Sequence, residues 1–99
     1  MKKRGRFHVL NIERVSEERQ GLIFYICRCY SDLPREKRER LDELYRKVGG
    51  AHADALRAVM ETDDSFVKIC REHFIASETT LKRMRTKFYL EFSLDELMK

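Results

Sequence analysis

The fold is decided by the stretch SFVKICREHFIASETTLKRMRTKF, which covers residues 65–88. In its first part, apolar or small side chains recur at a spacing that gathers them on one face of a helix. These positions are Phe66, Ile69, Cys70 and His73. In its second part, Ser77 is a good N-cap, and Leu81, Met84 and Phe88 recur at i, i+3 and i+7. The pattern predicts one helix from Asp64 to about His73, capped by Thr62 or Asp63, and another from Ser77 to about Leu90.

Two short helices joined by a three- or four-residue turn, the second opened by a capping Ser, are typical of a helix-turn-helix. We expect this motif at about residues 63–90. Cys70 stands where the two helices approach closely and a small residue is needed. Ile69 and Phe74 are predicted to be core positions of the first helix and the turn, and Leu81 and Met84 those of the second helix.

The outer face of this second helix is polar and basic when its apolar residues point inward. Four of the six residues from Lys82 to Lys87 are basic, and none is acidic. The capped first turn offers free N–H groups to a phosphate. Arg83 is suited to guanine, Thr79 to a base edge or a thymine methyl group, and Lys82 and Lys87 to phosphates. The candidate DNA-binding residues are Ser77, Thr79, Lys82, Arg83, Thr86 and Lys87. The competing interpretation is an amphipathic helix with a solvated basic face.

Apolar spacing predicts three further helices upstream. Ser16 caps a helix that extends to Tyr30, and Pro34 breaks the chain after it. An amphipathic helix follows from Arg35 to Val48, ended by Gly49-Gly50, and a short helix covers residues 51–61. The apolar positions of the last two are Leu41, Leu44, Tyr45 and Val48, then Ala55, Leu56, Val59 and Met60. One solvated acidic face is expected to hold Glu36, Glu39, Asp42 and Glu43.

The two ends of the chain differ in character. Residues 1–15 are basic and are predicted to form an arm, extended or disordered, or a strand that pairs in a dimer. Residues 16–99 are expected to be a single helical domain. Ser93 with Glu96 forms a capping box, and Phe92 with Leu97 has the spacing of a hydrophobic staple, which predicts a last short helix. The predicted fold is all-α, a small helical bundle with a C-terminal helix-turn-helix.

One segment resembles a known family. The residues Ala55-Leu56, Thr62-Asp63-Asp64-Ser65 and Ile75-Ala76-Ser77-Glu78-Thr79-Thr80-Leu81-Lys82-Arg83 carry the resemblance. Together they resemble the sigma-region-4-type helix-turn-helix of small regulators from phages and conjugative mobile elements, over about residues 51–90. The resemblance implies promoter or operator binding and transcription regulation, with residues 51–61 bracing the motif from behind. Many such motifs have Gly in the turn; residues 73–76 have none, so the register of the second helix stays open by about one residue.

Cysteine and histidine spacing gives no metal or catalytic site. On a helix, Cys27 and Cys29 point in nearly opposite directions, so they cannot grip one ion. Cys70 and His73 share a helix face, but that face is the predicted core. A Cys–His catalytic pair needs an orienting third group and a pocket, and the sequence shows neither. We expect reduced thiols, no metal, no cofactor and no enzyme activity.

Composition limits the partners of this chain of 99 residues. The net charge is +4, which is compatible with an anionic partner, and no apolar run of about 18 residues is present to span a membrane. Three cysteines and no export signal favour the cytoplasm. We expect double-stranded DNA as the partner, with a homodimer or a contact to RNA polymerase as further possibilities. The alternative is a small helical adaptor that binds another protein such as RNA polymerase or a repressor, because residues 22–30 and 88–92 are strongly apolar and Leu90 points outward.

Overall fold

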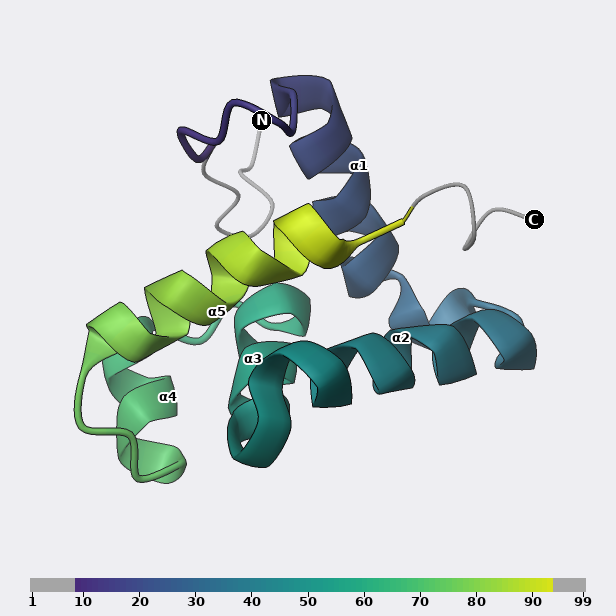
Figure 1. Cartoon of the computed structure of the whole chain (residues 1–99). Coiled ribbons are helices and arrows are strands. Elements are labelled where there is room, and N and C mark those ends of the chain that lie inside the picture. Colours follow the sequence, from purple (N-terminus) through teal and green to yellow (C-terminus); the bar gives the residue numbers. More distant parts are fainter. Residues whose placement is uncertain (1–8, 94–99) are drawn as a thin grey trace, which may run out of the picture.

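The computed structural model describes residues 9–93, and this part of the chain is all-α, as the sequence predicts (Figure 1). Most of the basic arm and the last helix predicted after Ser93 lie outside the described residues. The α-helices are α1 (Glu17–Arg28), α2 (Arg35–Gly49), α3 (Ala53–Glu61), α4 (Phe66–Glu72) and α5 (Glu78–Glu91). Two 3₁₀ turns, η1 (Tyr30–Asp32) and η2 (Gly50–His52), precede α2 and α3. No helix of residues 9–93 is both long enough and apolar enough to cross a membrane.

Serine side chains cap the beginnings of α1, α4 and α5. Ser16 caps α1 by accepting a hydrogen bond from the Arg19 N–H at 3.1 Å, as predicted. The cap predicted for α4 is wrong, because Ser65, rather than Thr62 or Asp63, accepts from the Lys68 N–H at 3.1 Å. The Thr62 hydroxyl instead donates to the Ala58 carbonyl at 2.7 Å, so it closes the end of α3.

The core lies between α5 on one side and α2, α3 and α4 on the other (Figure 1). The apolar stripes predicted from the sequence supply most of it. Among their members, Leu44, Phe66, Cys70 and Met84 pack against the core while partly exposed, and the prediction that His73 faces the core is wrong, because His73 is partly exposed and is not among the core residues. Its buried members are Ile23, Cys27, Leu41, Tyr45, Val48, Ala55, Leu56, Val59, Met60, Ile69, Ile75, Leu81, Phe88, Tyr89 and Phe92. One buried surface of α5 is therefore fixed by three other helices, and no other helix of residues 9–93 covers its opposite surface.

Residues 9–15 are held against α1 by one buried polar side chain, Gln20, which is only 1% exposed. Its carbonyl oxygen accepts from the Leu10 N–H at 2.8 Å. Its amide nitrogen donates to the carbonyls of Leu10 at 2.9 Å and Val15 at 3.0 Å. Gln20 thus supplies hydrogen-bond partners for the backbone groups of Leu10 and Val15, which need partners when they are buried. In a strand, such groups would pair with a neighbouring strand instead. The described end of the N-terminal segment is packed on the domain.

Candidate nucleic-acid interface

The outer face of α5 brings together five of the six predicted site residues. Thr79, Lys82, Arg83, Thr86 and Lys87 line one shallow hollow, which Leu90 closes at the far end. Their positions along the helix follow the i, i+3, i+4, i+7 repeat, so they form a single continuous stripe. The sixth residue, Ser77, does not line the hollow. It caps the helix by accepting a hydrogen bond from the Thr79 N–H at 3.1 Å.

The positive charges of this stripe are not neutralised within the described part of the chain. Lys82, Arg83 and Lys87 are exposed, and none forms an ion pair with another of residues 9–93. By contrast, Arg57 and Lys68 each pair with a carboxylate. The acidic residues of α5 stand only at its two ends, at Glu78 and Glu91. The face is therefore a polar, cationic strip.

The turn before α5 corrects the prediction that Phe74 belongs to the core. The Phe74 side chain is 92% exposed, and Ile75, at 8%, fills the core in its place. The Ile75 N–H donates to the Cys70 carbonyl at 2.9 Å, and Phe74 has a positive φ of 56°. This is the pattern of a Schellman closure, in which the residue after the helix adopts the left-handed conformation and the next one turns inward. Phe74 thus occupies the backbone position that Gly usually takes.

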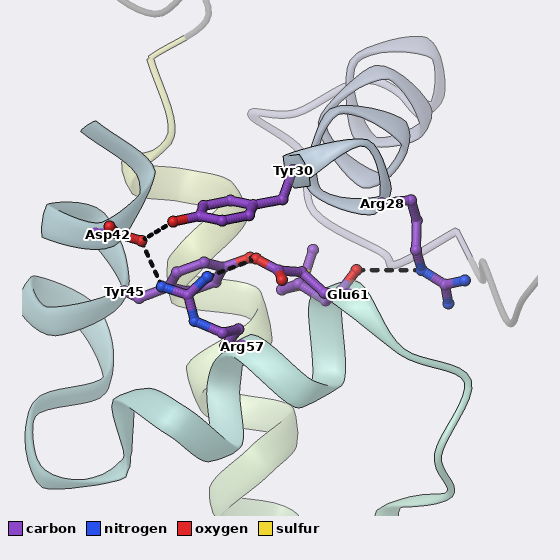
Figure 2. Close-up of polar contacts among 7 residues, drawn as sticks. Arg28, Tyr30, Asp42, Tyr45, Arg57 and Glu61 are labelled. Atoms are coloured by element: carbon purple, nitrogen blue, oxygen red, sulfur yellow. Dashed lines mark hydrogen bonds and ion pairs between the residues drawn. The ribbon is translucent and has the colours of Figure 1, made fainter. Parts of the chain in front are cut away.

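Behind this face, a polar network joins η1, α2 and α3 (Figure 2). The Arg57 guanidinium is hydrogen-bonded to Asp42 and lies 3.1 Å from a Glu61 carboxylate oxygen. It also stacks on the rings of Tyr30 and Tyr45, at 4.8 and 4.5 Å from the ring centroids. Tyr30 donates to Asp42 at 2.7 Å and Tyr45 to Glu61 at 2.8 Å. The prediction that Asp42 belongs to a solvated acidic face is wrong, because Asp42 is partly buried in this network.

The network reaches α5 through an aromatic contact. Tyr45 stacks on Phe88 of α5 with their ring centroids 5.1 Å apart. Near the same end of α5, Lys47 of α2 pairs with Glu91 at 3.1 Å. The position of α5 is thus tied to α2, and that of α2 to α3. In the first part of the chain, Arg28 (Figure 2) similarly fixes α1 to the end of α3 by donating to the Met60 carbonyl. It also forms an ion pair with the Asp63 carboxylate just after α3.

The network changes the acidity of its carboxyl groups in opposite directions. Burial raises the pKa of Glu61 above its ordinary value, and hydrogen bonds from Tyr45 and Arg57 oppose this only in part. Burial acts in the same sense on Asp42, but hydrogen bonds from Arg57 and Tyr30 outweigh it and lower the pKa. Both pKa shifts are explained by burial and by the partners of the two carboxylates within the network.

The cysteines and histidines singled out in the sequence are dispersed. Cys27 is buried, Cys29 is exposed, and Cys70 and His73 are partly buried on α4 and at its end. Within residues 9–93, no group of three or more histidine, cysteine or acidic side chains is close enough to hold a metal ion.

Sequence patterns did not predict two features of the site. The i,i+4 spacing of Arg57 and Glu61 signals an ion pair, but nothing in it shows that Asp42 completes the network. The exposure of Phe74 follows from backbone closure, which the apolar pattern does not reveal.

Comparison with protein-family models, with curated proteins and with solved structures gives no match to this chain.

Proposed function

We propose that this protein binds double-stranded DNA by placing the outer face of α5 in the major groove, as the second helix of a helix-turn-helix formed with α4. The observation that carries the proposal is the continuous stripe on α5, whose three exposed cations lack ion pairs to other described residues. A solvated surface helix usually mixes acidic with basic side chains, and this stripe has none of the former.

The dimensions of α5 suit this role. An α-helix with its side chains is about 10–12 Å across, which fits the major groove, about 12 Å wide, and the stripe from Thr79 to Lys87 extends about 12 Å along the helix axis. Leu81 and Phe88, both 0% exposed, hold the opposite side of the helix in the core. The stripe is thus held on a rigid helix, which favours a defined contact geometry.

Each residue of the stripe has a chemical assignment. Arg83, near the middle, is suited to a bidentate contact with guanine, and Thr79 to a base edge or a thymine methyl group. Lys82 and Lys87 are suited to phosphates on either side. Thr86 completes the polar surface between them. The resemblance of residues 51–90 to sigma-region-4-type regulators of phages and conjugative elements supports a role for this binding in transcription control at a promoter or operator.

The test is DNA binding by a double variant, Lys82→Ala with Arg83→Ala, against a matched double variant, Arg14→Ala with Arg19→Ala. All four side chains are exposed, and both variants lose two positive charges. The probe is a duplex selected from a random-sequence pool by the wild-type protein. We expect the α5 variant to lose about 10- to 100-fold in affinity and to lower the salt slope by about one, because Lys82 is the one of the two residues assigned to a phosphate, while the control changes little. Equal losses in the two variants would show that net charge alone, and not this face, produces the binding.

A second candidate function is that of an adaptor that binds another protein. The observation that favours it is the exposure of large apolar side chains away from the stripe. Leu22 and Tyr25 on α1 are 47% and 57% exposed, and Phe74 is nearly fully exposed. The two functions differ in their response to salt, because phosphate contacts release the counterions condensed on DNA, whereas contacts through these apolar side chains release none. Binding that barely changes between about 50 and 200 mM salt would favour the adaptor.

A further inference from the structure

A fourth cation of α5, Arg85, does not belong to the stripe. Its side chain is partly buried on the flank of α5 that faces α4, and its guanidinium carbon lies 5.1 Å from the centroid of the Phe66 ring. Phe66 is the first residue of α4. Arg85 follows Lys82 by three positions, so the two side chains are neighbours on the helix surface. The flank that Arg85 occupies therefore borders the stripe on its Lys82 side.

The Arg85 guanidinium lacks the acceptors that other partly buried arginines of this fold have. Its Nε is buried and has no hydrogen-bond partner, and Arg85 forms no ion pair with another of residues 9–93. Arg28 reaches two backbone carbonyls and Asp63, and Arg57 reaches Asp42 and Glu61. Burial lowers the pKa of Arg85, and the electrostatic effect of Tyr89 opposes this only in part.

The contact with Phe66 does not account for a cation at this position. A cation–π contact at a partly exposed site contributes about 0.5–1 kcal/mol, whereas a desolvated charge without a partner costs more than that. A methionine would pack against the same ring without the cost, since its flexible thioether makes favourable contacts with aromatic rings. Arg85 is only partly buried, and of its guanidinium nitrogens only Nε is both buried and unpartnered, so the other two nitrogens can bind an anion at the surface beside the stripe.

We propose that Arg85 binds a phosphate of the DNA backbone at the edge of the groove that receives α5. The inference rests on the proposed function, because that function places a phosphodiester strand along this flank. Planar guanidinium groups donate paired hydrogen bonds to phosphate oxygens, and Phe66 holds the plane of this one. Lys82, on the adjoining turn, would then contact the same strand. Arg85 adds affinity and no sequence preference, because phosphates are common to every sequence.

The experiment compares Arg85→Met with Arg19→Met, which removes the same charge from an exposed position on α1. The probe is again the selected duplex, with single phosphates replaced in turn by neutral methylphosphonates. We expect Arg85→Met to weaken binding about tenfold on every duplex tested and to lower the salt slope by about one. At one linkage, the methylphosphonate should weaken the wild type but not Arg85→Met further. The urea midpoint of Arg85→Met should equal or exceed that of the wild type.

Three outcomes would overturn this inference. If Arg85→Met unfolds more easily and binds DNA as the wild type does, Arg85 is a structural residue only. If every methylphosphonate affects Arg85→Met and the wild type alike, Arg85 contacts no phosphate. In both cases, loss of binding in the Lys82→Ala with Arg83→Ala variant would show that the proposed function itself stands. If the wild type selects no duplex, the proposed function and this inference fail together.

Discussion

The polar network around Arg57 predicts a large loss of stability in Arg57→Ala. The change removes the cation between two aromatic rings and leaves Asp42 and Glu61 without their common partner. The side chains of Asp42, Arg57 and Glu61 are 28%, 31% and 16% exposed, so the network is closer to a buried ion pair than to a surface one. Loss of one partner costs about 3–5 kcal/mol in a buried pair, against about 0–1 kcal/mol for an exposed pair. We expect a loss of about 2–4 kcal/mol.

Two matched variants separate charge from geometry. Arg57→Lys keeps the positive charge but loses the planar fork and most of the ring stacking, so we expect about half of the loss. In a double-mutant cycle, Arg57→Ala and Asp42→Asn should couple by at least about 1 kcal/mol, because the two groups share a hydrogen bond. The measurement is urea unfolding followed by circular dichroism at neutral pH. Additive effects, or a loss below about 0.5 kcal/mol in Arg57→Ala, would refute the view that this network holds α3 to α2.

Three further predictions concern the rest of the domain. Leu81→Ala should cost about 2–5 kcal/mol in the same unfolding assay, because Leu81 is 0% exposed between the helices around it. Phe74→Asn should raise the thermal midpoint or leave it unchanged, since Asn tolerates positive φ and little buried area is lost; a clear fall would mean that the ring packs in solution. Burial raises the pKa of Cys27 and of Tyr89 to about 12 each. The folded state therefore keeps protons that the unfolded chain releases, so the free energy of unfolding should fall as the pH rises from about 9 to 12. In Cys27→Ala this decline should be shallower by about one proton; an unchanged slope would show that the thiol is not buried.

The helices with regular apolar spacing could be predicted from the sequence, because their periodicity is a local property. The predicted α2 ends one residue before the observed one, and all four apolar positions assigned to the short helix, now α3, are buried. The first residue of α4 was harder to predict from the sequence. Thr62, Asp63 and Ser65 are all good capping residues, and only the backbone geometry shows that Ser65 accepts the hydrogen bond.

The polar network could not be predicted, because it depends on residues that are distant in the sequence. Asp42 lies one helical turn after Glu39 and directly before Glu43, and this acidic pattern favoured a solvated face. Arg57, which is fifteen positions later, approaches Asp42 only when α3 packs on α2. Tyr30 completes the arrangement from η1, a 3₁₀ turn that the sequence pattern assigned to the preceding helix or the break after it. A charge on a helix is thus solvated or buried according to what its tertiary neighbours offer.

The identity of the candidate interface depends on the register of α5, which the absence of Gly in the turn had left open. A shift of one residue rotates a helix by about 100°, which would replace most of the exposed stripe with other side chains. Two observations fix the register. Leu81 is completely buried, and Ser77 caps the helix with a direct hydrogen bond. The turn reaches this register without Gly because Phe74 adopts the left-handed conformation. The conformation of Phe74 places Ile75 in the core, two residues before the cap Ser77. The exposed ring of Phe74 is therefore a consequence of the same turn that directs the Lys82–Arg83 face outward.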